Sequence, residues 1–204
     1  MSQDPAETPT APFRDAPREG AALLIIDMIS EMDFRGIDAM QGELARVVDA
    51  IVRLREEADA AKIPILYVND NFGEWHSERS RLVERAQAAG SKGRAAAERL
   101  APRDRDYFII KPQSSGFYST NLPVLLPKLG VDRLILTGIS TDMCVLFTAA
   151  DAYMRDYRLW VPADATATPA RDRKAWALDL LAANLGAETA STERLALADW
   201  AEND

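Results

Sequence analysis

The stretch LILTGISTDMCVLFT, residues 134–148, determines how the rest of this 204-residue chain is arranged. It begins with the apolar residues 134–136, a short run typical of a strand buried on both faces of a sheet. Gly138 ends the run, and the polar residues 140–142 are candidates for a helix N-cap. From Met143 onward the pattern predicts a helix that continues to about Arg155. The stretch is therefore a buried strand, a tight turn and a helix.

The only cysteine of the chain, Cys144, falls in the first turn of this predicted helix. Helix N-termini carry unpaired N–H groups and the positive end of the helix dipole, and both favour a thiolate. We therefore expect the pKa of Cys144 to lie below that of free cysteine. The alternative is a buried and unreactive cysteine. A single cysteine also excludes an intramolecular disulfide, which suits a reducing compartment and predicts a cytoplasmic protein.

Strands alternate with helices on both sides of this stretch. Further strands are predicted at residues 21–26, 63–68, 107–110 and 157–161, with a short sixth strand at 187–190. Helical periodicity covers residues 38–61, 78–89, 122–129 and 168–186. The sequence predicts a three-layer α/β/α fold with a doubly wound, mostly parallel six-stranded sheet. We expect residues 20–204 to form one domain, preceded by a loosely ordered arm at residues 1–19 that is rich in proline, alanine and acidic residues.

Composition excludes several classes of partner. The net charge of −8 gives no basic patch for nucleic acid and disfavours binding to an anionic membrane. No apolar run approaches the roughly 20 residues of a membrane-spanning helix. His76 and Cys144 are the only imidazole and thiol, so a zinc or iron site and a metal cofactor are not predicted.

Three functional groups follow the ends of predicted strands. Asp27 ends the first strand, Lys111 ends the third, and Cys144 follows the fourth. Ligands of open α/β sheets bind outside the carboxyl ends of the strands, where these groups converge. Taken singly, Asp27 is explained as a cap and Lys111 as a solvated surface residue. Together they suit nucleophilic catalysis, because the lysine can stabilise both anions and the carboxylate can take the thiol proton.

Four segments in the expected order resemble the isochorismatase-like cysteine hydrolases, which include nicotinamidases, N-carbamoylsarcosine amidohydrolases and isochorismatases. These segments are LLIIDMISEMDF, YVNDNFG, IIKPQSSGFYSTNL and LILTGISTDMCV, followed by VPADATA after the fifth strand. The resemblance implies a sheet of order 3-2-1-4-5-6, a small-molecule substrate, no cofactor, and a homo-oligomer, either a dimer or a tetramer. Because strand three is then not adjacent to strand one, Lys111 must reach across, or its loop must fold back over the site.

The resemblance also implies a mechanism. Cys144 would attack an amide or carbamoyl carbon and form a thioester, while Asp27 accepts the thiol proton, protonates the departing amine and later activates water. Lys111 would hold Asp27. The family further implies a cis peptide between Ile139 and Ser140, which would turn the Ser140 N–H toward the Cys144 N–H. These two backbone donors would form an oxyanion hole.

This chain departs from two relatives. Nicotinamidases bind a metal through a D-x-H…H pattern after the second strand, whereas the corresponding residues 69–76 contain His76 alone, at the wrong spacing. We therefore expect a metal-independent enzyme in which Asp70 holds a turn. Isochorismatases cleave a vinyl ether and can work without the cysteine, so Cys144 favours C–N hydrolysis and leaves vinyl-ether hydrolysis as the alternative. A nucleotide-binding module is a third possibility, but no G-x-G-x-x-G or G-x-x-x-x-G-K-[ST] motif is present.

Candidate substrate-binding residues are harder to predict from the sequence. Phe34, Trp75 and Phe117 are candidate aromatic walls, and Asn71 and Gln113 are candidate polar contacts. The alternative for the aromatic residues is structural packing at the edge of the core. The arginine-rich residues 74–105 are a candidate lid or oligomer contact.

Overall fold

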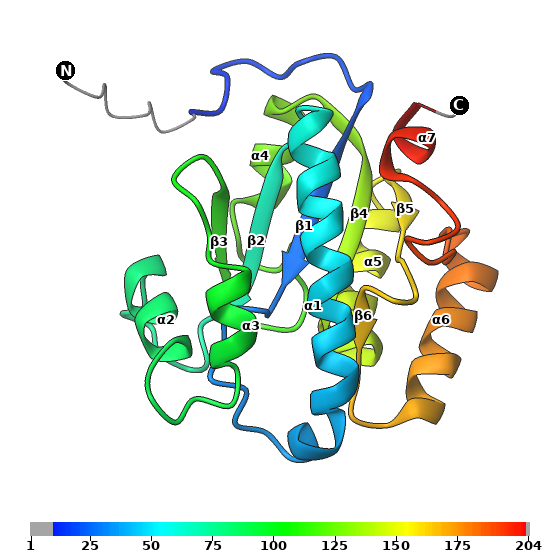
Figure 1. Cartoon of the computed structure of the whole chain (residues 1–204). Helices are drawn as coiled ribbons and strands as arrows, with labels where there is room; N and C mark the ends of the chain where they lie inside the picture. Colours follow the sequence, from blue (N-terminus) through cyan, green and yellow to red (C-terminus); the bar gives the residue numbers. More distant parts are fainter. Residues whose placement is uncertain (1–9, 203–204) are drawn as a thin grey trace.

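A six-stranded sheet forms the centre of the computed structural model, which describes residues 10–202 (Figure 1). The strands are β1 (Gly20–Ile26), β2 (Ile65–Asp70), β3 (Tyr107–Lys111), β4 (Val131–Ile139), β5 (Arg158–Trp160) and β6 (Thr166–Ala167). The order is β3-β2-β1-β4-β5, every paired strand is parallel, and β6 pairs with the end of β4. The predicted α/β fold with a doubly wound, six-stranded parallel sheet is confirmed.

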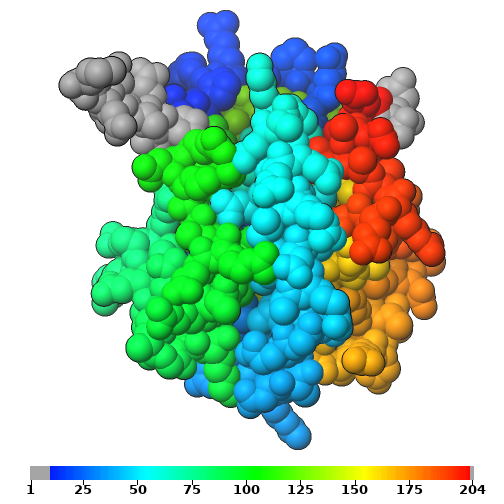
Figure 2. All heavy atoms as spheres, in the orientation of Figure 1, coloured from blue at the N-terminus to red at the C-terminus, as the bar shows by residue number. Residues whose placement is uncertain are grey.

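Helices cover both faces of the sheet. They are α1 (Ile37–Ala60), α2 (Arg79–Ala86), α3 (Arg94–Arg99), α4 (Leu122–Lys128), α5 (Leu146–Tyr153), α6 (Arg171–Leu185) and α7 (Leu197–Glu202). One apolar cluster joins the sheet to α1, α2, α3 and α7, and a second joins the opposite face to α4, α5 and α6. Figure 1 shows α1 and α3 in front of the strands, and Figure 2 shows α1, in cyan and blue, running between the α2–α3 segment and the C-terminal segment.

The central strand β1 explains why this fold forms. All of its residues after Gly20 are buried, and they alternate between the two clusters: Leu23 and Ile25 face one, and Leu24 and Ile26 the other. A strand that is apolar on both faces is stable only between two layers of helices. The register pairs Ile26 with residues of both β2 and β4, so the residues that follow these three strands meet at one edge of the sheet.

Two local predictions are corrected by the structure. Residues 187–190 do not form the sixth strand, because only a single bridge joins Glu188 to Trp160, and the sixth strand is β6 instead. Cys144 does not lie in the first turn of an α-helix. It lies in a π-helical turn, η1 (Thr141–Val145), in which the N–H of Val145 donates to the carbonyl of Ser140, and α5 begins only at Leu146.

The segment before β1 is held against the far end of the sheet. The N–H of Ala16 donates to the carbonyl of Pro127 (3.1 Å), and that of Glu19 donates to the carbonyl of Gly130 (3.1 Å). Residues 1–9 of the predicted arm lie outside the described residues. None of the helices between residues 10 and 202 combines the length and the apolar character needed to cross a membrane.

Candidate active site

Asp27 directly follows β1 and is turned into the protein. Its backbone is left-handed (φ 53°), and its N–H donates to the carbonyl of Val68. The side chain is almost fully buried, and its Oδ1 accepts a hydrogen bond of 2.7 Å from the N–H of Asp70. Its Oδ2 lies 2.9 Å from the Nζ of Lys111. The carboxylate is therefore fixed through both of its oxygens.

Lys111 is the last residue of β3, and its side chain has 0% exposed surface. Its Nζ reaches past β2 and lies 2.9 Å from Asp27, 3.1 Å from Oδ2 of Asp70 and 3.4 Å from the Sγ of Cys144. A buried ammonium is costly unless paired, and here two carboxylates surround it. The sequence left two possibilities: either Lys111 reaches across β2, or its loop folds back over the site. The structure shows the first, because the long side chain of Lys111 spans the distance from β3 to Asp27.

Cys144 completes the cluster from the opposite side of β1. Its Sγ accepts a hydrogen bond from Nζ of Lys111, and the charge of Asp27 acts directly on the thiol. The turn that carries it begins at Gly138, whose φ is 105°, and a Cβ there would lie 2.0 Å from the carbonyl oxygen of Ile26. Only glycine allows β4 to approach β1 this closely. The peptide bond between Ile139 and Ser140 is cis.

The resting protonation states follow from burial and from neighbouring charges. Burial raises the pKa of Asp27, although the adjacent Lys111 opposes this increase. Burial and then the charge of Asp27 raise the pKa of Cys144 to about 12, and Lys111 only partly opposes them. The expected lowering by a helix N-terminus is thus wrong for the resting site. Burial lowers the pKa of Lys111, but the interactions with its neighbours, of which the charge of Asp27 is the largest, together outweigh burial and hold that pKa above its usual value, so a neutral thiol lies beside an ammonium in the resting site.

Asp142 is a buried residue of η1 that the sequence analysis did not select. Its Oδ1 accepts a hydrogen bond of 2.5 Å from the hydroxyl of Thr168, and its Oδ2 lies 2.6 Å from Nε of Arg173 on α6. These contacts tie the turn that carries Cys144 to the segment after β6. The sequence signal for this role is weak, since Asp142 is indistinguishable there from an ordinary helix cap.

Asp70 has two roles, of which the sequence indicated one. Its Oδ1 accepts a hydrogen bond from the N–H of Phe72 and holds the predicted turn, while its Oδ2 contacts Lys111. His76 is exposed on the loop that follows. Within residues 10–202 no group of three or more His, Cys, Asp or Glu residues is arranged to hold a metal ion. The residues present therefore do not fit the metal site of nicotinamidases.

The five candidate substrate-binding residues are not brought together. Phe117 is in the core, where its ring centroid lies 6.1 Å from that of Tyr157. The side-chain oxygen of Asn71 accepts a hydrogen bond from the N–H of Gly73, so it shapes its own turn. Trp75 is 78% exposed and Gln113 is also exposed.

Among the five candidates, Phe34 lines a cavity in the part of the chain that the structure describes. This cavity measures about 320 Å³, and it also includes Ile29, two residues after Asp27, and Phe72, two residues after Asp70. Arg85 also lines the cavity, and it forms ion pairs with Glu31 and Glu74. Because its lining comes from the segments that directly follow Asp27 and Asp70 in the chain, the cavity is a candidate place for the part of a substrate that does not react.

Known proteins resemble this chain in sequence and in fold. The chain is 36% identical over 174 residues to the isochorismatase family protein YaaI of Bacillus subtilis, which covers 85% of this chain and 95% of YaaI. It is 29% identical over 188 residues to the ureidoacrylate amidohydrolase RutB of Methylorubrum extorquens, covering 77% of this chain and 75% of RutB. The crystal structure of N-carbamoylsarcosine amidase from Thermoplasma acidophilum superposes with a TM-score of 0.66 at 28% identity, covering 87% of this chain and 99% of that one.

A family model describes almost the whole of the folded part. The isochorismatase domain matches residues 21–194, which run from β1 through the segment after α6. This range contains the strand ends that carry Asp27, Lys111 and Cys144. The chain is a hydrolase that belongs to the isochorismatase family.

Proposed function

We propose that this protein is a metal-independent cysteine hydrolase that cleaves a C–N bond of a small amide, ureide or carbamoyl compound through a thioester. The single observation that carries the proposal is the contact of one buried ammonium, Lys111, with both the Asp27 carboxylate and the Cys144 sulfur. A carboxylate base, a thiol nucleophile and a fixed cation within hydrogen-bond reach are the parts that nucleophilic acyl transfer requires.

The resting thiol determines the first step. Because the pKa of Cys144 is raised, its proton passes to Asp27 as the sulfur attacks the carbonyl carbon. The raised pKa of Asp27 makes this carboxylate a stronger base than an exposed one. The ammonium of Lys111 stabilises the negative charge while it moves from oxygen to sulfur. The new C–S bond leaves a tetrahedral oxyanion, for which the N–H groups of Ser140 and Cys144 are the proposed donors.

The second half of the reaction returns the proton. Asp27 donates the proton to the departing nitrogen as the C–N bond breaks, which releases ammonia or an amine and leaves a thioester on Cys144. Asp27, again a carboxylate, then takes a proton from water, whose oxygen attacks the thioester carbon. Collapse of this intermediate breaks the C–S bond, releases the acid and restores the thiol with the proton held by Asp27.

The names of the relatives support hydrolysis of a C–N bond. RutB is named a ureidoacrylate amidohydrolase and the Thermoplasma acidophilum enzyme an N-carbamoylsarcosine amidase, and both names describe hydrolysis of a small compound with an amide-type C–N bond. Metal independence is supported by Lys111, whose ammonium lies between Asp27 and Asp70 where it supplies the positive charge. Vinyl-ether hydrolysis of the isochorismatase type is the alternative, and the position of Cys144 against Asp27 favours the amide reaction.

An ammonia-release screen over small amides, ureides and carbamoyl compounds tests the proposal. We expect release by the wild type and by Met154→Ala, a change at an exposed methionine of the α5 C-terminus, and none by Cys144→Ala. Hydroxylamine should intercept the thioester as a hydroxamate. Release that persists in Cys144→Ala would contradict the mechanism. Turnover of isochorismate by Cys144→Ala would favour vinyl-ether chemistry instead.

A further inference from the structure

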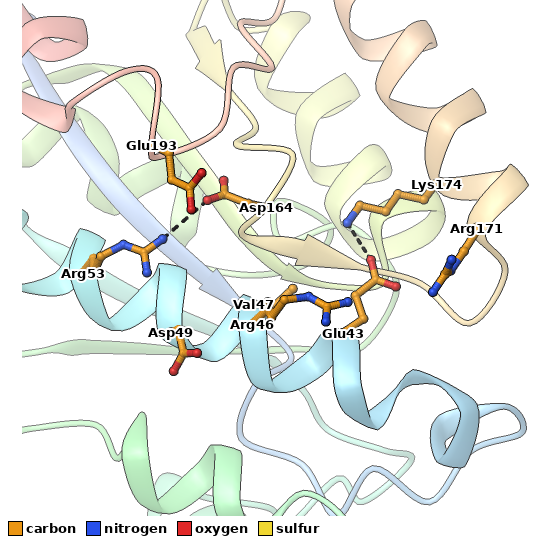
Figure 3. A pocket seen from close by; sticks show the side chains of 9 residues that line it. All are labelled: Glu43, Arg46, Val47, Asp49, Arg53, Asp164, Arg171, Lys174 and Glu193. Atoms are coloured by element: carbon orange, nitrogen blue, oxygen red, sulfur yellow. Dashed lines mark hydrogen bonds and ion pairs between the residues drawn. The ribbon is translucent and has the colours of Figure 1, made fainter.

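A second, strongly charged cavity lies away from Asp27, Lys111 and Cys144. It is a groove of about 570 Å³ between α1, the loop before β6 and the first turn of α6 (Figure 3). Its lining consists of Glu43, Arg46, Val47, Asp49, Arg53, Asp164, Arg171, Lys174 and Glu193. All but Val47 are charged, and the volume suits a small organic molecule.

Part of this charge is neutralised within the groove. Nζ of Lys174 lies 2.7 Å from Oε1 of Glu43 and also donates to the carbonyl of Thr166. Arg53 lies 3.6 Å from Asp164, as Figure 3 shows. Asp49 pairs with Arg99, outside the groove. These pairs form a fixed framework, and three charged groups of the lining have no partner within residues 10–202.

The unpaired groups are Arg46, Arg171 and Glu193. Among the residues that the structure describes, none of the three has a side-chain hydrogen bond or ion pair. Arg46 on α1 faces the α6 side of the groove that carries Arg171, and the Glu43–Lys174 pair lies between them (Figure 3). Glu193 lies at the other end, beside Asp164. Both guanidinium groups are exposed to solvent and lie on either side of this ion pair, in a chain of net charge −8.

We propose that this groove binds a small carboxylate that also carries a cationic N–H donor, such as an amino acid. Guanidinium groups match a carboxylate with paired hydrogen bonds, which assigns the anionic end of the ligand to Arg46 and Arg171. The free carboxylate of Glu193 accepts the N–H donors at the opposite end. Glu43 does not repel the ligand, because Lys174 neutralises it at 2.7 Å.

The groove is connected to the backbone that carries Cys144. Lys174 holds the carbonyl of Thr166 in β6, and β6 pairs with Gly138 and Ile139 of β4. Arg173, on the same turn of α6, contacts Asp142 in η1. A ligand bound to Arg171 therefore fixes the turn of α6 that supports this segment, and it will raise the melting temperature of the protein.

Calorimetric titration of the full-length protein at low salt tests the proposal, with β-alanine, propionate and inorganic phosphate as probes. We expect β-alanine to bind more tightly than propionate, which lacks the ammonium, and to raise Tm. Arg46→Gln and Arg171→Gln should each weaken β-alanine binding about tenfold, the loss of one charged hydrogen-bonding partner. Arg14→Gln, which removes an exposed arginine that has no side-chain partner among residues 10–202, should change nothing. Glu193→Gln should abolish the advantage of β-alanine over propionate.

Each other outcome would overturn part of this assignment. Undiminished β-alanine binding in both arginine variants would place the ligand elsewhere, and no binding at all would leave the groove a purely internal ion-pair network. Binding of phosphate alone would contradict the carboxylate assignment. Equal binding of β-alanine and propionate by the wild type would contradict the role of Glu193.

Discussion

The ammonium nitrogen of Lys111 lies 2.9 Å from Oδ2 of Asp27, although β2 separates the two strands that carry them. The contact depends on the length of the lysine stem, which crosses above the end of β2 and meets Asp70 there. One cation thus joins the ends of three adjacent strands. This arrangement makes Lys111 both a structural and a chemical part of the site.

Lys111→Met is expected to destabilise the fold. It leaves the buried Asp27 and the half-buried Asp70 without their cation, and removal of one partner of a buried ion pair costs about 3–5 kcal/mol. The free energy of unfolding in urea measures the loss. Lys128→Met, which removes a more exposed lysine paired with Asp15, should change it by less than about 1 kcal/mol. Similar small losses in both variants would contradict the structural role of Lys111.

Asp27→Asn should make the thiol easier to ionise and yet abolish activity. The charge of Asp27 raises the pKa of Cys144, while Lys111 lowers it, so without the carboxylate the pKa falls below the wild-type value of about 12. Because Cys144 is the only cysteine, the difference in ultraviolet absorbance from the same protein with Cys144→Ala isolates the thiolate from the tyrosines and reports this titration. Full activity of a more acidic thiol would show that Asp27 is not the base.

In the pH profile of kcat/KM, the pKa of the acid limb should lie above the usual pKa of an aspartate side chain. The base form of Asp27 is required, burial raises the pKa of this group, and activity is lost as the pH falls through that value. Asp70→Asn removes a negative charge near Asp27 and releases Lys111 to pair with it alone. Both effects lower the pKa of Asp27, so the acid limb should move to lower pH in this variant. A limb that does not move would exclude Asp27 as its origin.

Two glycine substitutions should have opposite effects on stability. In Gly138→Ala the new Cβ would lie 2.0 Å from the carbonyl oxygen of Ile26, at a φ of 105° that alanine disfavours. We expect a loss of about 4 kcal/mol or more, which is exceptional for one methyl group. Gly42→Ala is the matched control, because it lies within α1 with no atom near the new Cβ, and it should gain about 0.5–1 kcal/mol. Chemical denaturation measures both, and a Gly138→Ala protein as stable as the wild type would contradict the close approach of β4 to β1.

The main strands could be predicted from the sequence, because a long apolar run such as residues 21–26 is stable only when both faces of the strand are buried. It was insufficient for β6, whose two residues carry no periodicity and are defined only by pairing with Gly138 and Ile139. Residues 187–190 looked like a strand for the opposite reason. Their composition permits one, but the chain turns away after a single bridge at Glu188.

For the active site, the sequence predicts where the side chains lie but not how their surroundings change their pKa values. That Asp27, Lys111 and Cys144 meet follows from the geometry of parallel strands, which carries the three side chains to one edge. The raised pKa of Cys144 could not be predicted from the sequence, because burial and the adjacent carboxylate outweigh the effect of a helix N-terminus. In addition, Cys144 lies in a π-helical turn and not in an α-helix. Likewise Asp70 was assigned only to its turn, since no local pattern reveals that its second oxygen faces Lys111.

The complete burial of Lys111 affects which surface charges can be substituted during the evolution of this protein. Dissolved ions cannot approach a side chain with no exposed surface, so the attraction between Lys111 and its two carboxylates is scarcely screened. Exposed charges elsewhere on the protein are screened by dissolved ions, so their influence on the site weakens over about 10 Å at 0.1 M salt. Exposed residues outside the charged groove of α1 and α6 can therefore gain, lose or exchange charge, and the surface can adapt to a new ionic environment while the triad keeps a similar local field.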